Sequence, residues 1–379
     1  MKAIINAKII QPDHIIPDGT VILDNDRIAA FGRHLDTEGM EIIDAQGAYV
    51  GPGLIDIHTH SDGETFFYED PVKAAAAVLA HGVTDVLPAL YFNVGREELL
   101  RQIRTVREAA ESGKAPNILG LYMEAPYLNP KFGCNKENNP WKGAVDPADY
   151  LPIIEAAGDF ARVWCVAPER ENIAAFAADV KKRFPAAVFS VAHSEAEPSQ
   201  IEALMPCGLK LATHHTNATG TLYKYPECRT ACVDETAQYH DEIYTELICD
   251  KVGIHVAPYM LRLIRKIKGD DRIILISDAF VDHGPIPEGG LYEGADDINF
   301  DFSGEIAGSK MILDGPCRNM MIHTGASLCQ VFKFASSNPA AVLGLTDRGR
   351  IAVGYKANLI LVDAEFSLKA VFLAGQKVR

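Results

Sequence analysis

Eight short apolar segments recur along the middle of the chain, and each is followed by a longer helix-like stretch. Branched residues are frequent in these segments and turn residues bound them, which is typical of strands buried in a parallel sheet. They span residues 53–60, 82–90, 117–126, 161–169, 187–194, 208–215, 244–250 and 272–279. Eight such strands alternating with helices predict an α/β fold of the (β/α)₈ type, a TIM-like barrel.

The two ends of the chain follow a different pattern. Residues 1–50 contain short segments in which apolar and polar positions alternate, such as "GTVILDNDRIAAFG", with turn residues between them. The pattern returns near the other end in "GRIAVGYKANLILVD". Such alternation indicates antiparallel strands with one face in water. We therefore predict a small sheet domain formed by residues 1–50 and 346–379, beside a barrel formed by residues 51–345.

Composition limits the classes of function. With 379 residues, 48% of them hydrophobic, the chain can bury the core of one large domain and a smaller companion. Its 36 Lys and Arg against 51 Asp and Glu give a formal charge of -15, which argues against nucleic acid as a partner. No apolar run approaches the ~20 residues of a membrane span, no secretory leader is evident, and the scattered cysteines form no CxxC pair. We expect a cytoplasmic protein with reduced thiols and no membrane contact.

The first barrel segment, "LIDIHTH", ends in two histidines. His58 and His60 are two positions apart, so on a strand both side chains point to the same side and reach one cavity. The pair is either a set of metal ligands or two hydrogen-bonded histidines at a strand end. This segment alone supports both interpretations equally.

Four more residues with suitable chemistry fall at the ends of predicted barrel strands: Glu124, His193, His214 and Asp278. The C-terminal ends of barrel strands converge on one face, where this fold builds its active sites. Each residue alone is more simply explained as structural, for example as a helix cap. Together with the histidine pair they predict a metal site, because burying several imidazoles and carboxylates without a counter-ion is costly.

These residues also carry a family resemblance. The segments "GLIDIHTH", "GLYMEAPYLNP", "FSVAHSEA", "ATHHTNAT", "ELICDKVGIHV" and "LISDAF" appear in a characteristic order that extends to "SSNPAAVLGLTDRGRIAVGYKANLILVD". In this the chain resembles the amidohydrolase superfamily and, within it, the N-acetylglucosamine-6-phosphate deacetylases. The resemblance covers nearly the whole chain. It implies a metal-dependent catalytic barrel, a β-sandwich made from both chain termini, and a homodimer in which loops reach across to the neighbouring site.

The resemblance also implies a role for each candidate. It places the main metal on Glu124, His193 and His214 and a second metal on His58 and His60. In the family's H-x-x-N-A-M motif the ligand stands three residues before the asparagine, which selects His214 and leaves His215 unassigned. Zinc is the natural metal for such donors, with one or two ions per subunit, although iron or manganese suits similar sets.

The implied reaction is hydrolysis of the acetamide of N-acetylglucosamine 6-phosphate. A metal lowers the pKa of water towards about 7, and Asp278 would accept a proton from that water and deliver it to the leaving nitrogen. The resemblance implies that His255 contacts the substrate. It also implies that the backbone at Asn217 and Ala218, together with Arg229, contacts the phosphate of the substrate. Arg229 equally suits an ordinary surface position.

Several segments depart from the family pattern. The family's "EGP" is "EAP" here and its "NAM" is "NAT". Residues 61–70 lack the usual glycine-rich sequence, and residues 131–145 are expanded, so that Asn135 or Val145 replaces an expected histidine or glutamine. These segments line the substrate side. Two alternatives therefore stay open: an amidohydrolase for another amide (an N-acyl amino acid, a cyclic amide or an aminated base), and a non-catalytic barrel, against which the intact set of metal-ligand candidates argues.

Overall fold

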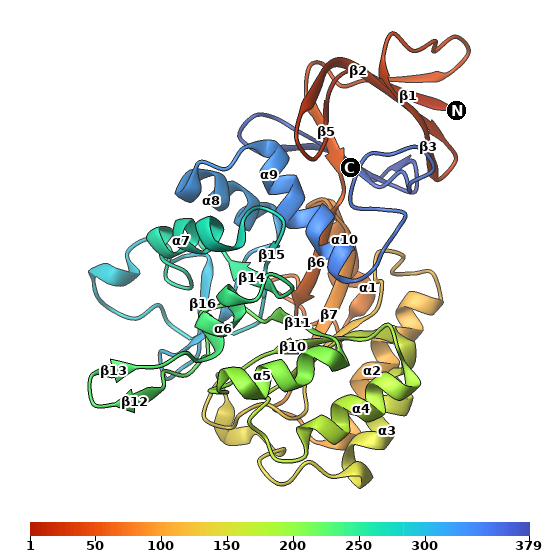
Figure 1. Cartoon of the computed structure of the whole chain (residues 1–379). Coiled ribbons are helices and arrows are strands. Elements are labelled where there is room, and N and C mark those ends of the chain that lie inside the picture. Colours follow the sequence, from red (N-terminus) through yellow and green to blue (C-terminus); the bar gives the residue numbers. More distant parts are fainter. Residues whose placement is uncertain (283) are drawn as a thin grey trace.

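The computed structural model describes residues 1–282 and 284–379, which form a barrel with a separate sheet at one end (Figure 1). The barrel contains eight parallel strands in sequential order, as predicted. They are β6 (Leu54–Thr59), β7 (Val83–Tyr91), β8 (Leu121–Glu124), β9 (Ala161–Val166), β10 (Val188–Val191), β11 (Leu209–Ala212), β14 (Tyr244–Ile248) and β15 (Ile273–Ile276).

Backbone hydrogen bonds beyond the strand ends join the last strand, β15, to the first, β6. The N–H of Asp278 donates to the carbonyl of His58 at 3.0 Å, and the N–H of His60 donates to the carbonyl of Ala279 at 2.9 Å. These bonds lie at the C-terminal end of the barrel. The segments that carry His58, His60 and Asp278 are therefore held side by side by the closure itself.

Helices follow the barrel strands. They are α1 (Pro71–Ala80), α2 (Arg96–Glu111), α3 (Pro147–Ala157), α4 (Ile173–Arg183), α5 (Pro198–Leu204), α6 (Val233–Tyr239), α7 (Pro258–Lys268), α8 (Asp314–Thr324), α9 (Leu328–Phe332) and α10 (Asn338–Val342). Two of them begin at an Asp-Pro pair: the Asp70 and Asp146 carboxylates accept N–H groups of the first turn, and proline fills the first helical position. Proline is suited to that position because its missing N–H has no partner in a helix start.

The chain ends form a second sheet of eight strands in one hydrogen-bonded system. Its strands are β1 (Lys2–Ile10), β2 (Ile15–Asp24), β3 (Arg27–Arg33), β4 (Glu41–Asp44), β5 (Tyr49–Pro52), β18 (Leu359–Val362), β19 (Leu368–Leu373) and β20 (Gln376–Lys377). This confirms the predicted domain built from both termini. The predicted boundaries at residues 50/51 and 345/346 stay a prediction, and the first of them falls within β5.

Strand β18 shows why this sheet has a core of its own and still packs on the barrel. Leu359 and Leu361 point into the core of the sheet domain, whereas Ile360 and Val362 join the barrel core. The period of two along a strand sends alternate side chains to opposite faces. An ion pair between the buried Asp85 of β7 and the partly buried Arg348 links the barrel to the segment before β18.

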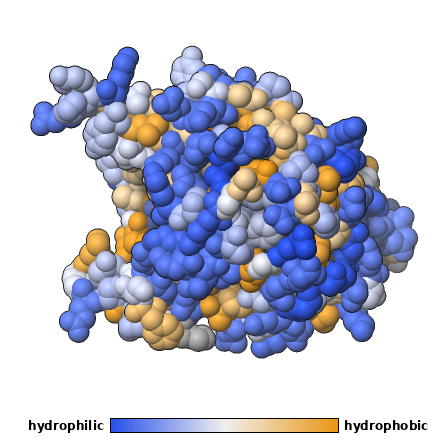
Figure 2. Space-filling model, turned by 90° about the horizontal axis from the view of Figure 1, so that it is seen from below, coloured by the Kyte–Doolittle hydropathy of each residue, from blue (hydrophilic) through white to orange (hydrophobic). Residues whose placement is uncertain are grey.

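Two hairpins extend from the loops after the barrel strands. The first consists of β12 (Tyr223–Tyr225) and β13 (Cys228–Arg229) and projects from the body, and the second consists of β16 (Ile298–Phe300) and β17 (Ile306–Ser309) (Figure 1). Seen from below that view, the surface is mostly hydrophilic, with apolar residues in small scattered groups (Figure 2). Within residues 1–282 and 284–379, no helix has the length and apolar character required to cross a membrane.

Candidate metal centre

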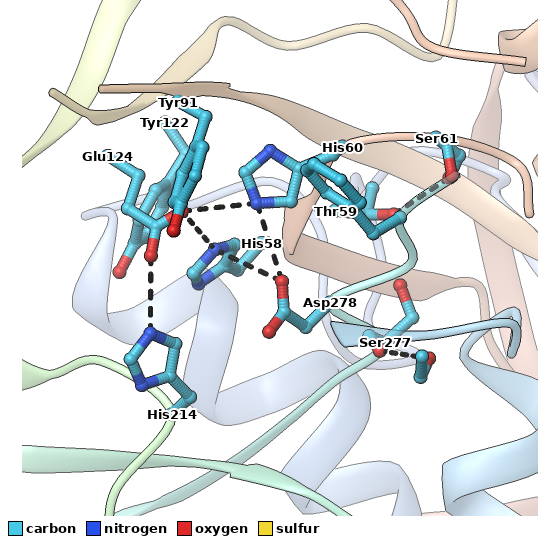
Figure 3. A network of polar contacts seen from close by, with 12 residues as sticks. His58, Thr59, His60, Ser61, Tyr91, Tyr122, Glu124, His214, Ser277 and Asp278 are labelled. Atoms are coloured by element: carbon cyan, nitrogen blue, oxygen red, sulfur yellow. Dashed lines mark hydrogen bonds and ion pairs between the residues drawn. The ribbon is translucent and has the colours of Figure 1, made fainter. Parts of the chain in front are cut away.

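Six of the predicted site residues meet at the C-terminal end of the barrel, where five strands present them. His58 lies within β6, His60 follows that strand and Glu124 is the last residue of β8, whereas the other three each stand two residues beyond a strand end. All six are buried: His58, His60, Glu124, His193, His214 and Asp278. Glu124 lies between His214 on one side and His58 with His60 on the other (Figure 3).

The first group consists of Glu124, His193 and His214. Oε1 of Glu124 lies 2.7 Å from Nε2 of His193 and 3.2 Å from Nε2 of His214. The two Nε2 atoms are 3.1 Å apart. One candidate ligand atom from each residue lies within 4.8 Å of the others.

The second group consists of His58, His60 and Asp278. One candidate ligand atom from each of these residues also lies within 4.8 Å of the others. Oδ1 of Asp278 lies 3.4 Å from Nε2 of His60 and 3.6 Å from Nε2 of His58. Oε2 of Glu124 lies 3.1 Å from Nε2 of His60. Glu124 thus directs one carboxylate oxygen at each group.

These residues fit divalent cations. Nε2 of His58 and Oε2 of Glu124 are buried without a hydrogen-bond partner in the described part of the chain. The Nε2 atoms of His193 and His214 face each other at 3.1 Å. Two nitrogen lone pairs repel each other at this distance unless a cation or a proton lies between them. Imidazole nitrogens combined with carboxylate oxygens are a donor set typical of zinc, iron and manganese.

The surrounding histidines favour the ionised form of both carboxylates. Burial alone would raise the pKa of Glu124, but hydrogen bonds from the surrounding histidines, His193 first among them, hold that pKa well below its usual range. Burial also opposes ionisation of Asp278, yet the charge of His58 and the hydrogen bond from His60 lower its pKa to about 2. Both shifts favour the ionised form, which can hold a cation or accept a proton.

Three of the residues have a strained backbone. His193, His214 and Asp278 have φ angles of +43°, +28° and +45°. Side chains other than glycine rarely adopt this left-handed region, and each such residue costs ~1–3 kcal/mol. All three follow barrel strands by two residues, so the strain is confined to the turns that place side chains in the barrel mouth.

Glu246, a fully buried residue of β14, is a site residue that the sequence pattern did not indicate. Its Oε2 lies 3.1 Å from Nδ1 of His58 and also accepts hydrogen bonds from the Tyr122 hydroxyl at 3.2 Å and the His214 N–H at 3.3 Å. When Nδ1 of His58 donates to this carboxylate, the lone pair of Nε2 is free to face a metal. The available signal was a single glutamate inside the apolar run "YTELICD".

Asp250 was also missed, and it orients the predicted substrate residue His255. Its Oδ1 accepts the N–H groups of residues 252–254, and its Oδ2 lies 2.8 Å from the His255 N–H and 3.2 Å from Nδ1 of the same residue. Burial would raise the pKa of Asp250, but the hydrogen bonds, that from His255 first, lower it to about 2. Because an ionised carboxylate only accepts, Nδ1 of His255 donates to it, and Nε2 is buried without a partner among the described residues.

A cavity of about 380 Å³ opens above the two groups. Four of the metal-ligand candidates line it: His60, Glu124, His193 and His214. Asp278, His255, Asn217 and Ala218 line it as well. The side-chain Nδ2 of Asn217 is buried and makes no hydrogen bond to any described residue, whereas the backbone N–H of Asn217 donates to the His214 carbonyl at 2.9 Å. The structure thus brings these three predicted substrate residues to the same space as the metal groups.

Other predicted positions lie elsewhere. Arg229 sits on the projecting hairpin, exposed and paired with Glu235 at 2.7 Å, and it is not among the described residues that line the cavity. His215 is buried beside Gln238, away from the cavity, and burial lowers its pKa to about 3. Of the residues described, neither Asn135 nor Val145 lines the cavity.

The chain matches a known protein family. The sequence model of the amidohydrolase family matches residues 49–378. An N-acetylglucosamine-6-phosphate deacetylase of Bacillus subtilis (strain 168) is 26% identical over 94% of this chain and 92% of its own length. An N-acetylgalactosamine-6-phosphate deacetylase of Escherichia coli O157:H7 is 25% identical over 86% of each protein.

Solved structures agree with the fold. A mutant N-acetyl-D-glucosamine-6-phosphate deacetylase from Mycobacterium smegmatis, in complex with N-acetyl-D-glucosamine-6-phosphate, has a TM-score of 0.82 and 26% identity, and the match covers 100% of this chain and 99% of that one. The N-acetylglucosamine-6-phosphate deacetylase from Pasteurella multocida has a TM-score of 0.85 and 24% identity over 99% of both chains.

Proposed function

The chain belongs to the amidohydrolase family, and from that premise we propose that it is a metal-dependent deacetylase that converts N-acetylglucosamine 6-phosphate to glucosamine 6-phosphate and acetate. The observation that carries the proposal is the complete donor set at the floor of a cavity large enough for a sugar. The similarity to deacetylases over nearly the whole chain supports the same substrate class. A barrel kept only for binding has no physical need for six buried ionisable groups.

The family uses divalent metal ions, and two candidate positions exist. We propose that Glu124, His193 and His214 hold the main ion and that His58 and His60 hold a second one, with Glu124 facing both. We propose zinc, and iron or manganese would suit the same donors. When bound, such a cation lowers the pKa of water and polarises the carbonyl of the acetyl group.

The remaining chemistry falls to residues of this chain. Ionised Asp278 lines the cavity and accepts a proton from the attacking water, and later returns it to the departing amine nitrogen. Nε2 of His255 accepts a hydrogen bond from a sugar hydroxyl, since Nδ1 is committed to Asp250. The backbone N–H of Asn217 donates to the His214 carbonyl, so we propose that the side-chain Nδ2 of Asn217 donates to the substrate instead, beside the backbone of Ala218.

We propose a homodimer in which Arg229 serves the partner's site. The hairpin that carries Arg229 projects from the body (Figure 1), and Tyr223 and Tyr225 on it are 62% and 72% exposed. Exposed tyrosines on a projecting element are typical of an interface. We further propose a cytoplasmic location, which the eight free cysteines support.

The test is acetate release from a panel of amides by the purified protein, with metal per subunit measured on the same sample. The panel holds N-acetylglucosamine 6-phosphate, its galactosamine epimer, an N-acetyl amino acid, a cyclic amide and an aminated base. We expect turnover of a hexosamine phosphate that a chelator abolishes and added metal restores. Turnover of another amide alone would replace the proposed substrate. A protein that binds no metal and hydrolyses none of these amides would refute the proposal that the chain is an enzyme.

A further inference from the structure

The metal-ligand histidines differ in how the second ring nitrogen is held. Nδ1 of His58 lies 3.1 Å from Oε2 of Glu246, and Nδ1 of His214 lies 3.2 Å from the Asn217 carbonyl. Nδ1 of His193 is buried and makes no hydrogen bond to any described residue. A ligating imidazole is usually oriented through that nitrogen. Among the described residues, His193 therefore depends on its backbone and on packing for its orientation.

The backbone turn at His193 is held by a carboxylate from the loop after β9. Oε2 of Glu169 accepts the hydroxyl of Ser194 at 2.7 Å, and Oε1 accepts the backbone N–H of Glu195 at 2.9 Å. Both donors lie within two residues of His193, whose φ angle is +43°. A residue in this left-handed conformation keeps it only where the surrounding structure holds it there. Glu169 supplies that support.

The same carboxylate holds the loop after β8, the strand that ends in Glu124. Oε1 of Glu169 accepts the side-chain amide of Asn129 at 2.7 Å, and the backbone N–H of Asn129 donates to the His193 carbonyl at 3.0 Å. The segments that carry Glu124 and His193 are thus joined at Asn129. Because Oε1 of Glu124 lies only 2.7 Å from Nε2 of His193, a shift of either segment would change the spacing of these two ligand atoms.

Ser194 extends the network to the loop after β11, which carries His214. The N–H of Ser194 donates to the Ala218 carbonyl at 3.2 Å, and the N–H of Gly220 donates to the Ser194 carbonyl at 2.9 Å. The three segments that present the ligands of the main metal position are therefore connected around Glu169.

Glu169 itself lies outside the site. It is half-buried, it is not among the described residues that line the cavity, and it belongs to neither group of candidate ligands. Two of its donors, Asn129 and Ser194, are buried, with 6% and 0% exposure, so solvent cannot readily replace the carboxylate. If the carboxylate were lost, the turn at His193 would have to move for these donors to find other acceptors.

We propose that Glu169 is a positioning residue for His193: it fixes the turn after β10 against the loop after β8 and so sets the affinity of the main metal position. The inference rests on the proposed function for the role of the metal, but the affinity can be measured without substrate. The second position, on His58 and His60, is carried by β6 and should respond much less.

Three variants test the proposal. Glu169→Ala removes the acceptor of all three donors and should weaken the main ion about 10-fold, the low end of the 10- to 100-fold typical of groups that orient a metal ligand, because it acts through the backbone. Glu169→Gln keeps an oxygen for Asn129 and the Glu195 N–H, so it should lose about threefold or less. Glu195→Gln is the matched control: its side chain pairs with Lys131, and both ions should be unaffected.

The assay is competition between the zinc-loaded protein and a chelator, with metal per subunit and the thermal unfolding midpoint measured for each variant. Turnover of N-acetylglucosamine 6-phosphate by Glu169→Ala should return towards the wild-type value as zinc is added. A variant with a lower midpoint but unchanged affinity for both ions would make Glu169 a merely structural residue and overturn the proposal. Equal weakening of both ions, or equal losses in Glu169→Ala and Glu169→Gln, would also overturn it.

If Glu169→Ala does not fold, Ser194→Ala decides. It removes one of the three donors, so it should weaken the main ion about threefold and spare the second, and an unchanged affinity would refute the proposal. If the wild-type protein holds zinc but hydrolyses no hexosamine phosphate, the proposed function fails alone, whereas the zinc affinities still decide the role of Glu169.

Discussion

Changing Glu246 to glutamine tests how the second metal position is built. The carboxylate is fully buried and its Oε2 serves three donors, one of them Nδ1 of His58 at 3.1 Å. Glutamine has nearly the same volume, and its amide oxygen can accept from the Tyr122 hydroxyl and the His214 N–H. The fold should therefore persist, while His58 loses a charged partner and becomes a weaker donor to a metal.

The size of the effect follows from that contact. Removing the hydrogen-bonded carboxylate behind a ligating histidine costs about 10- to 100-fold in metal affinity, or about 1.4 to 2.7 kcal/mol. The ion on Glu124, His193 and His214 should lose much less, because Glu246 meets that group only through the backbone N–H of His214 at 3.3 Å. We expect the second ion to dissociate first and the main ion to stay.

The assay is competition with a chelator, followed by metal per subunit and by the thermal unfolding midpoint of each sample. Asp250→Asn is the control, since it makes the same carboxylate-to-amide change at a residue that contacts His255 and neither metal group. Equal loss of both ions from the Glu246 variant, or unchanged affinity for both, would refute the reasoning about His58. A variant that fails to fold would show that the amide cannot satisfy the three donors.

Three further predictions follow from the site and from one buried carboxylate outside it. Asp278→Asn should keep its metal and lose at least ~10² in turnover, as expected when a proton carrier is removed; near-normal turnover would mean that another group moves the proton. Changing His58 to Asn together with His60 to Gln should reduce metal from two ions towards one while some activity remains; unchanged metal content would make the pair structural. Burial alone would raise the pKa of Asp314, but its hydrogen bond with His81 lowers it, so its contribution to stability is present above the ordinary aspartate pKa and is lost as the pH falls through the lowered value. Asp314→Asn should therefore flatten the acid side of the curve of unfolding midpoint against pH, and an unaltered curve would contradict this.

The barrel was predictable because its strands are local patterns. A run such as "RIILISDA" is apolar, short and bounded by polar residues, so its period and length identify a buried strand without any knowledge of its neighbours. The candidate ligands were predictable for a related reason. Their place at strand ends, combined with the convergence of those ends in this fold, brings His58, His193 and Asp278 together before any distance is known.

Residues that act through distant partners were not predictable from local patterns. Glu246 is 188 positions from His58 along the chain, and Asp85 is 263 positions from Arg348. Nothing in the segment around either residue specifies its partner, because each contact depends on how loops from different strands pack over the barrel.

The amino-acid sequence by itself determined the strands, the helices and the kind of chemistry that the strand ends can perform. These follow from periodicity and residue type, which act over a few neighbouring positions. Only the tertiary structure decided that Glu124 directs one oxygen at each ligand group, that Arg229 lies outside the cavity of its own chain, and that Glu246 lies behind His58. The physical reason is that hydrogen bonds and ion pairs require their atoms within about 3 Å, and segments far apart in the sequence reach that distance only when barrel closure and loop packing place them there.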